Sequence, residues 1–441
     1  MTGTGPKLVI RQQFAEEVAK NKNFSFGENF RIDYMAHYPG FQGIQVGLDK
    51  GILIHDTVAK KLTPMVSLII GDLVDEAADA IKEAMKDDRQ WQSVEIDEKV
   101  QWIIARVSSR IFLGKPLCRT TKWLQIAEKY TMNVFIGSAY LRAIPSLLRP
   151  LAHWFVPACR VLRKQVKDAR SLIGDDVRDR EHVTNTLLAE GKKVPKKADT
   201  ISWFVEMARE HGYELSTNDL VSLQLFLTIV ANHTTTEAIN LALKHLCEHP
   251  EIVQPLREEI VRVLGEQTWS KASISKLCIM DSFLKESQRH SRGLATLMRI
   301  ATADTVLSNG LVIKKGTRMA LLNGCMDEKH YASPTTFDAY RFLNAHEETS
   351  AGKRNTAQFV SLSAEQMGFG LGVHACPGRF FVAHEMKIVM AFLLLKYDFQ
   401  FDAEFGNPEV YVIEGNPLWN PKAKLMYRRR SEEIDLSLMV D

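Results

Sequence analysis

Apolar residues recur along most of this chain with the spacing of an amphipathic helix. The pattern holds over residues 68–85, 126–135 and 252–264, where apolar positions return every three or four residues. A longer stretch, residues 220–247, repeats it around a wide apolar face and predicts a long, largely buried helix. The mostly apolar run at residues 380–395 predicts another helix. The chain is therefore expected to be mainly α-helical.

Strand patterns are few and gather near residues 305–322. Within this stretch, Asn309-Gly310 and Lys315-Gly316 mark two tight turns. No long linker rich in Gly, Ser or Pro, internal repeat or low-complexity run divides the sequence. We therefore expect one mainly α unit with small β-sheets, although 441 residues exceed an ordinary small domain.

Composition narrows the class of protein modestly. The net charge of +3 gives no reason to expect a nucleic-acid partner. Six cysteines are scattered without CxxC pairs, which indicates free thiols in a reducing compartment. No apolar run reaches the ~18–20 residues that a membrane-spanning helix needs. By itself this chain is expected to be soluble or peripheral to a membrane.

One cysteine follows a glycine-rich loop and precedes the predicted helix at 380–395. The segment reads Phe369-Gly370-Leu371-Gly372-Val373-His374-Ala375-Cys376-Pro377-Gly378-Arg379. Pro377 suits the first position of a helix, which would place Cys376 at the helix N-terminus, where the dipole stabilises a thiolate. The glycines allow the backbone to lie close to a flat ligand. Taken alone, the segment favours a buried structural cysteine, so a metal-binding role needs further motifs.

Two further segments carry paired charges. Glu286 and Arg289 are three residues apart within the predicted helix at 280–290, so both lie on one helix face. Arg341 stands between Tyr340 and Phe342, which indicates a partly buried guanidinium. An isolated pair of this kind is more simply a surface ion pair, worth ~0–1 kcal/mol.

The middle of the long predicted helix reads Ala231-Asn232-His233-Thr234-Thr235-Thr236. Threonine is a poor helix former, and its hydroxyl can bond to a carbonyl one turn earlier and bend the helix. A break of local rules is typical of functional sites. From this segment alone, however, a helix that tolerates threonines is the simpler interpretation.

In this order and at these distances, the motifs resemble those of the cytochromes P-450, over nearly the whole chain. The resemblance implies the P-450 fold and a haem b cofactor whose iron takes the Cys376 thiolate as axial ligand. Gly370 and Gly372 would lie against the cofactor, and the Phe369 ring would pack beside the thiolate.

The same resemblance assigns the paired charges. It implies that Glu286, Arg289 and Arg341 form a buried structural triad on the proximal side of the cofactor. An arginine suits such a triad because its planar fork bonds to a carboxylate and to backbone carbonyls at once.

The threonine segment resembles the helix that crosses over the haem in this family. Thr234 matches the threonine that orients water and protons toward dioxygen, and Thr235 matches its neighbour. His233 stands where an acidic residue is usual, and Ala231 where glycine is common. Similar His-Thr-Thr segments occur in fungal members. The resemblance therefore implies proton delivery by Thr234 with His233 or water.

Family position also suggests which groups bind the haem carboxylates and the substrate. His374 and Arg299 are the expected cationic partners, with Lys60 or Lys61 as a third, although solvated lysines on a helix explain that pair equally well. The substrate pocket is expected to be mainly apolar, with residues 38–44, Leu227, Val230, Ala231, 293–296 and 416–419 in its lining.

These assignments imply a fungal-type monooxygenase that oxidises a lipophilic small molecule with dioxygen. No nucleotide-binding or flavin module is evident, so electrons would come from a separate NADPH-cytochrome P-450 reductase. Substrates of such relatives are often terpenoids, alkaloids or polyketides of secondary metabolism, and the family location is the cytosolic face of the endoplasmic reticulum membrane.

Alternatives remain open at this point. One is a reductase-independent haem-thiolate isomerase or dehydratase, and another is a non-catalytic haem-binding protein. Residues 1–441 are expected to form a single haem domain that lacks the N-terminal anchor, early helix and first strand of fungal relatives.

Overall fold

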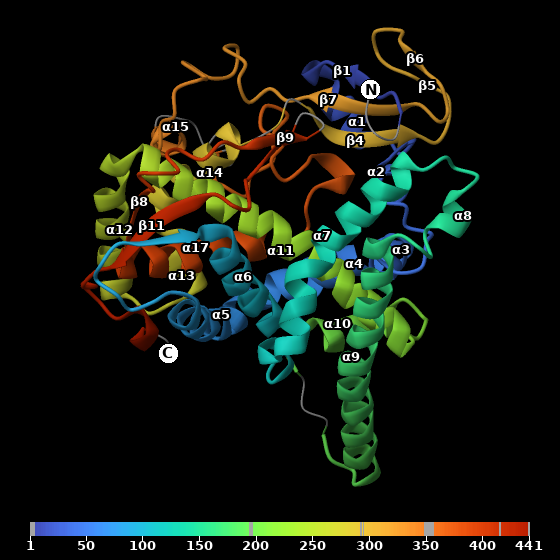
Figure 1. Ribbon diagram of the computed structural model, residues 1–441, viewed down its shortest axis with the longest axis horizontal. Helices are drawn as coiled ribbons and strands as arrows, with labels where there is room; N and C mark the ends of the chain where they lie inside the picture. Colours follow the sequence, from blue (N-terminus) through green and yellow to red (C-terminus); the bar gives the residue numbers. More distant parts are fainter. Residues whose placement is uncertain are drawn as a thin grey trace. The chain divides into compact units, whose positions relative to one another are not determined.

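The computed structural model of the chain describes residues 5–193, 197–291, 293, 295–347, 357–413 and 416–439 (Figure 1). The chain divides into two compact units. Unit 1 comprises residues 1–29, 77–103 and 235–441, and unit 2 comprises residues 30–76 and 104–234. Each unit is described by itself below.

Helices account for most of the described chain. They are α1 (Ala15–Lys20), α2 (Phe26–Asp33), α3 (Gln42–Asp49), α4 (Gly51–Thr57), α5 (Thr63–Ala84), α6 (Ile96–Phe112), α7 (Thr121–Ala143), α8 (Arg149–Ala152), α9 (Pro157–Ala189), α10 (Thr200–Glu210), α11 (Thr217–Glu248), α12 (Val253–Glu266), α13 (Lys271–Ser275), α14 (Cys278–His290), α15 (Arg341–Glu347) and α17 (Arg379–Lys396). Two short turns also matter for the site: the π-helical η2 (Val58–Leu62) and the 3-10 turn η5 (Gly372–His374).

The strands are short. They are β1 (Leu8–Ile10), β2 (Phe24–Ser25), β3 (Gln92–Glu95), β4 (Ala295–Ala301), β5 (Thr305–Val306), β6 (Val312–Ile313), β7 (Arg318–Leu322), β8 (Tyr397–Phe401), β9 (Tyr411–Ile413), β10 (Asn416–Leu418) and β11 (Lys424–Arg429).

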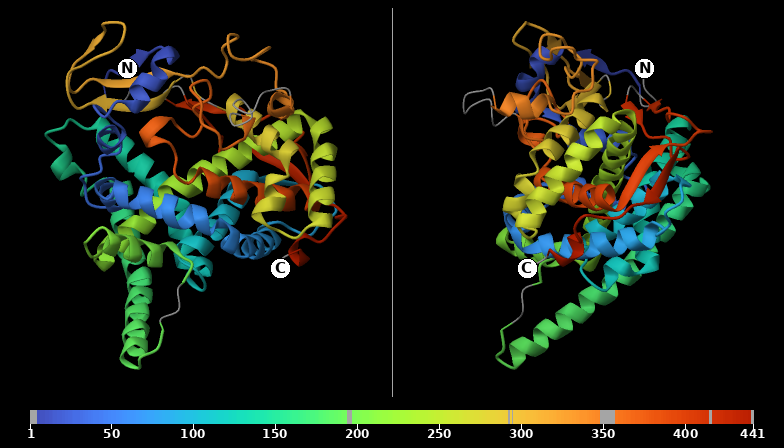
Figure 2. Two further views of the ribbon diagram at one scale, coloured as in Figure 1. Left: turned by 180° about the vertical axis from the view of Figure 1, so that it is seen from behind. Right: turned by 90° about the vertical axis from the view of Figure 1, so that its left-hand side faces the viewer.

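Unit 2 consists of helices and the turns that connect them, with no strand among its described residues. α7 and α9 pack against each other, and α9 continues well past its neighbours (Figure 2). Tyr130 of α7 is fully buried, and its hydroxyl donates to the carbonyl of Gly40 at 2.9 Å. This bond fixes the loop before α3 against α7, in the part of the chain that sequence reasoning assigned to a substrate pocket.

Unit 1 carries the β-structure. One sheet has the order β1-β7-β4-β2, in which β1 runs parallel to β7 while β4 is antiparallel to both β7 and β2. A second sheet, β3-β11-β8, is antiparallel, and β9 pairs with β10. Buried residues of α1, including Val18 and Ala19, join a core cluster with Met319 and Leu321 of β7. This packing places α1 beside the sheet that carries Arg299.

The predicted elements are largely confirmed. The stretches 220–247 and 380–395 are α11 and α17, and the three shorter periodic stretches lie in α5, α7 and α12. The region 305–322 forms β5, β6 and β7. Gly310 and Gly316 have φ values of +83° and +85°, as its two tight turns require. The mainly α fold with small β-sheets is therefore confirmed, and the single haem domain stays a prediction.

One predicted boundary was wrong. The helix after the cysteine begins at Arg379 with Gly378 as its N-cap, whereas Pro377 was expected at the first helical position. Pro377 and Gly378 form a turn instead, and the Gly378 carbonyl accepts the amide of Val382 at 3.0 Å. Cys376 therefore precedes the helix by three residues and does not cap it.

Candidate haem-thiolate site

The cysteine loop is closed by its own backbone. The amide of Cys376 donates to the carbonyl of Phe369 at 2.7 Å, and Arg379 donates to the carbonyl of Cys376 at 2.9 Å. The thiol is half-buried and belongs to no disulfide. Since the loop ends at the N-terminus of α17, the positive end of that helix dipole still favours a thiolate.

The two glycines of the cysteine loop have backbone conformations that favour glycine, and Gly372 is also closely packed. Gly370 and Gly372 have φ values of +74° and +67°, which disfavour any residue with a side chain. A Cβ on Gly372 would lie 2.5 Å from the Ala19 carbonyl oxygen of α1. Gly372 is thus explained by the approach of α1, and contact of either glycine with a cofactor stays a prediction. The Phe369 ring packs edge-on against Phe359, with centroids 5.2 Å apart, so its place beside the thiolate is also untested.

Arg299 is a buried cation on β4. The side chain is 2% exposed, its Nη1 donates to the carbonyl of Met298 at 2.8 Å, and its Nε has no hydrogen-bond partner. No acidic side chain among the described residues forms an ion pair with it. Burial lowers the pKa of Arg299 to about 10, so the guanidinium is charged at neutral pH and lacks a compensating anion.

His374 lies close to this cation. The rings of His374 and Phe26 have centroids 6.2 Å apart, and the Arg299 guanidinium lies 5.6 Å from the same Phe26 ring. Burial, and then the positive charge of Arg299, lower the pKa of His374. A buried, uncompensated guanidinium close to an imidazole fits a ligand that carries carboxylates, as haem does.

The triad predicted from the sequence is assembled in unit 1. Glu286 of α14 accepts two bonds from Arg289, at 2.7 and 2.8 Å, and one from Nε of Arg341 at 3.1 Å. Glu286 and Arg289 are fully buried. Burial alone would raise the pKa of Glu286, but the bonds from Arg289 and His290 outweigh it and lower that pKa to about 2. The three residues are together, and their role beneath a cofactor stays a prediction.

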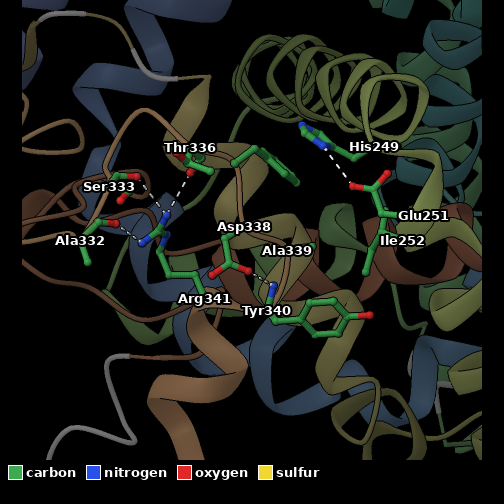
Figure 3. Close-up of a pocket in the computed structure, with 11 residues that line it drawn as sticks. His249, Glu251, Ile252, Ala332, Ser333, Thr336, Asp338, Ala339, Tyr340 and Arg341 are labelled. Atoms are coloured by element: carbon green, nitrogen blue, oxygen red, sulfur yellow. Dashed lines mark hydrogen bonds and ion pairs between the residues drawn. The ribbon is translucent and has the colours of Figure 1, made fainter.

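The remaining arginine donors tie the triad to the chain between β7 and α15. Arg289 donates to the carbonyls of Cys325 (2.7 Å) and Pro334 (2.6 Å), while Arg341 donates to those of Ala332 (2.7 Å) and Thr336 (2.9 Å). Arg341 also lines a cleft of about 570 Å³ together with His249, Glu251 and residues 336–340 (Figure 3). No residue of the cysteine loop lines this cleft, so we assign it no part in the cofactor site.

The threonine segment of α11 presents one exposed hydroxyl. Thr234 is exposed, and its Oγ1 donates to the carbonyl of Val230 at 2.8 Å, one turn earlier, as expected for threonine in a helix. Thr235 and Thr236 are each 1% exposed, and their hydroxyls have no hydrogen-bond partner in the described structure. His233 meets Phe135 edge-on at 5.4 Å, and burial lowers the pKa of its imidazole. His233 is therefore neutral near pH 7.

A half-buried acid on α11 was missed from the sequence. Glu237, three residues after Thr234, accepts the backbone amide of Trp419 at 2.5 Å. Burial raises the pKa of Glu237 to about 7, with a smaller contribution from the charge of Asp97. The available signal was an acidic residue in a helix segment whose neighbours are otherwise uncharged.

Lys60 and Lys61, on η2 in unit 2, already have carboxylate partners. Lys60 pairs with Asp56 at 2.8 Å, and Lys61 pairs with Glu206 and Glu210 at 3.2 and 3.1 Å. Binding of a haem carboxylate by either lysine stays a prediction.

The residues expected to line the substrate pocket differ in their exposure to solvent. Leu227 is 5% exposed and belongs to the core, whereas Val230 is 41% exposed on the same face as Thr234. Residues 416–418 form β10, and Ala295 opens β4. Leu294 lies outside the described residues.

Comparison with known proteins identifies the family. The family model described as cytochrome P-450 matches residues 3–414. Cytochrome P-450 monooxygenase 1 of Gibberella fujikuroi is 36% identical over 438 residues, which are 98% of each chain. The monooxygenases bsc2 and bsc11 of Alternaria brassicicola are 38% and 35% identical over 99% of this chain and 82% and 84% of their own.

A solved structure agrees on the fold. The retinoic acid-bound cyanobacterial CYP120A1 superposes with a TM-score of 0.66 at 17% identity, covering 85% of this chain and 78% of its own. Among the described helices, none combines the length and apolar character needed to cross a bilayer. Since the family match spans nearly the whole sequence, the chain belongs to the cytochrome P-450 family and is an oxidoreductase, a monooxygenase of the haem-thiolate class.

Proposed function

We propose that this chain binds haem b through Cys376 and inserts one atom of dioxygen into a lipophilic small molecule. One observation carries the proposal: the cysteine loop lies near Arg299. The Arg299 guanidinium is buried and pairs with no acidic side chain among the described residues. Haem held by a thiolate supplies the activation of dioxygen. The second oxygen atom leaves as water, which consumes two electrons and two protons per turnover.

Different side chains would bind different parts of the cofactor. Cys376 holds the iron, Arg299 and His374 hold the haem carboxylates, and Gly372 lets the loop lie flat against α1. Lys60 is a weaker third candidate because Asp56 already neutralises it. These residues orient the cofactor by charge pairing and hydrogen bonding.

Proton delivery falls to the exposed hydroxyl on α11. Thr234 donates to the Val230 carbonyl, so its own oxygen is left to accept a proton or order a water molecule. His233, kept neutral by burial, can accept and pass on a proton. Thr235 supports the segment from a buried position.

The partners follow from the chemistry. Electrons come from a separate NADPH-cytochrome P-450 reductase, and the substrate is a secondary metabolite of terpenoid, alkaloid or polyketide type, since the relatives are fungal monooxygenases. The proposed location is the cytosolic face of the endoplasmic reticulum, and the proposed organisation is one haem domain over residues 1–441.

Carbon monoxide tests the thiolate. Reduced protein with carbon monoxide should give the red-shifted Soret band of thiolate-ligated haem, and Cys376→Ala should abolish it. Cys278→Ala is the matched control because that exposed cysteine lies on α14, outside the cysteine loop. An unshifted, imidazole-type band in the parent protein would contradict the assignment.

Product analysis then separates oxidation from rearrangement. Candidate metabolites fed to a host that expresses the chain with a reductase should yield a product heavier by one oxygen atom or otherwise oxidised. A product that forms equally without reductase and NADPH would instead establish the isomerase or dehydratase alternative.

A further inference from the structure

Strand β4 contains a leucine in the left-handed region of backbone conformation. Leu297 has a φ of +47°, which residues other than glycine, asparagine and aspartate rarely adopt. β4 lies beside β7 (Figure 1), and the pairing between the two strands shifts at this point. Thr296 pairs with Leu321 and Arg299 pairs with Met319, so three residue steps on β4 span two on β7. Leu297 therefore belongs to a β-bulge, in which β4 holds one residue more than its neighbour.

The Leu297 side chain anchors this bulge. It is 6% exposed and belongs to the core cluster that also contains Phe14, Phe24 and Leu321. A left-handed φ is unfavourable for a residue with a Cβ, and it persists only where the surrounding structure enforces it. Burial of a leucine side chain stabilises the fold by an amount comparable to that cost. Packing of the side chain in the core therefore holds the backbone of the bulge in place.

The bulge directly precedes Arg299, the buried cation without an acidic partner. The Met298 carbonyl, next to Leu297, accepts a hydrogen bond from Nη1 of Arg299 at 2.8 Å. The guanidinium also lies 5.6 Å from the ring of Phe26. Nε of Arg299 has no hydrogen-bond partner in the described structure. One guanidinium nitrogen is thus fixed by the bulge, while Nε is left to donate to a ligand.

We propose that Leu297 is a positioning residue for the anionic group that Arg299 binds. The leucine anchors the bulge, the bulge directs the Met298 carbonyl toward Arg299, and that carbonyl fixes the guanidinium. Strained residues cluster beside ligand-binding groups, and a β-bulge can re-aim a neighbouring side chain. Leu297 acts through Arg299 and holds no ligand itself. The inference rests on the proposed function, in which the bound group is a haem carboxylate.

Haem release from the haem-loaded chain tests this role. Leu297→Val keeps an apolar side chain but is β-branched, which makes a left-handed φ far less favourable. This variant should transfer haem to excess apomyoglobin faster than the parent by roughly tenfold, because Arg299 loses its fixed position. Leu297→Met is unbranched, keeps the core contact and should release haem at nearly the parent's rate. Should Leu297→Val not load haem, Leu297→Ala, which removes the anchor, should give the same acceleration.

A second substitution separates positioning from packing. Arg299→Gln alone should also accelerate haem release. Leu297→Val should then add no further acceleration in that background, because both changes remove the same contact. Leu307→Val is the matched control, since Leu307 is 2% exposed in the same core cluster but lies outside β4. It should lower the urea midpoint and leave haem release unchanged.

Three results would overturn the inference while the carbon monoxide spectrum of the parent stays normal. The first is release from Leu297→Val at the parent's rate. The second is an acceleration that adds fully to that of Arg299→Gln. The third is an equal acceleration by Leu307→Val, because a loosened core would then be sufficient. A parent without the thiolate band would instead overturn the proposed function, and this inference with it, before any variant is made.

Discussion

Two buried charged side chains in unit 1, Glu286 and Arg299, differ in whether a partner of opposite charge compensates them. The Glu286 carboxylate accepts hydrogen bonds from Arg289 and Arg341, and His290 lies beside it, so its negative charge is compensated. The Arg299 guanidinium is equally inaccessible but pairs with no acidic side chain in the described residues. An uncompensated buried charge is strongly disfavoured. Arg299 is therefore the residue that points most directly to an anionic ligand.

Removal of the Glu286 carboxylate should destabilise the protein severely. Glu286→Ala leaves the fully buried Arg289 without its partner, which costs about 3–5 kcal/mol. We expect haem-loaded protein to be lost on expression, and the urea midpoint of any remaining protein to fall. Glu258→Ala, an exposed glutamate on α12, is the control. A stable, haem-loaded Glu286→Ala protein would remove Glu286 from the structural triad.

Removal of the Thr234 hydroxyl should affect chemistry and spare folding. Thr234→Ala should lower the fraction of electrons that reach product by roughly tenfold and raise peroxide release, because proton delivery slows. The measurement compares NADPH consumption, peroxide and product with a substrate found by the product screen. Thr236→Ala is the matched control, since the buried Thr236 hydroxyl has no hydrogen-bond partner in the described structure. Unchanged coupling in Thr234→Ala would assign the protons to another group.

At the scale of elements, α11 is more than a core helix. Its sequence satisfies helical periodicity over 32 residues, yet it carries polar groups in its middle that a buried helix does not need. Thr234 faces outward, whereas Glu237 receives the amide that follows β10. Within unit 1, Glu237 thus links α11 to Trp419, the residue that follows β10, through a half-buried carboxyl group.

That burial predicts a pH dependence of stability. The folded pKa of Glu237, about 7, exceeds its ordinary value of 4.5. The folded protein therefore holds a proton that the unfolded chain has lost between these values, and stability should fall as pH rises from about 4.5 to 7. Glu237→Gln keeps an acceptor for Trp419 but cannot ionise. Measured by urea titration, its free energy of unfolding relative to that of the parent should rise between about pH 4.5 and pH 7, by up to roughly 3 kcal/mol. A difference in unfolding free energy between Glu237→Gln and the parent that does not change with pH would contradict the assignment.

At the scale of the whole molecule, the motifs are widely separated in sequence. Glu286, Arg341 and Cys376 all lie in unit 1, with Arg299 on its sheet, while Thr234 ends unit 2 within the continuous helix α11.

The sequence by itself determined the helices, the strand region and the members of the Glu286–Arg289–Arg341 cluster, and it singled out the cysteine loop. These follow from local rules: apolar periodicity sets a helix, Asn-Gly and Lys-Gly set turns, and a spacing of three places Glu286 beside Arg289. The family motifs then predicted the roles of these residues.

Only the tertiary structure decided what depends on neighbours distant in sequence. Gly372 is required because Ala19 of α1 approaches it, and the pKa of Glu237 is raised because of burial and, to a smaller extent, the charge of Asp97. Lys60 is neutralised by Asp56, one turn earlier in the helical segment that leads into η2. The start of α17 shifted to Arg379 because Pro377 and Gly378 prefer a turn there. Burial and charge compensation are sums over spatial neighbours, which the linear order of residues does not contain.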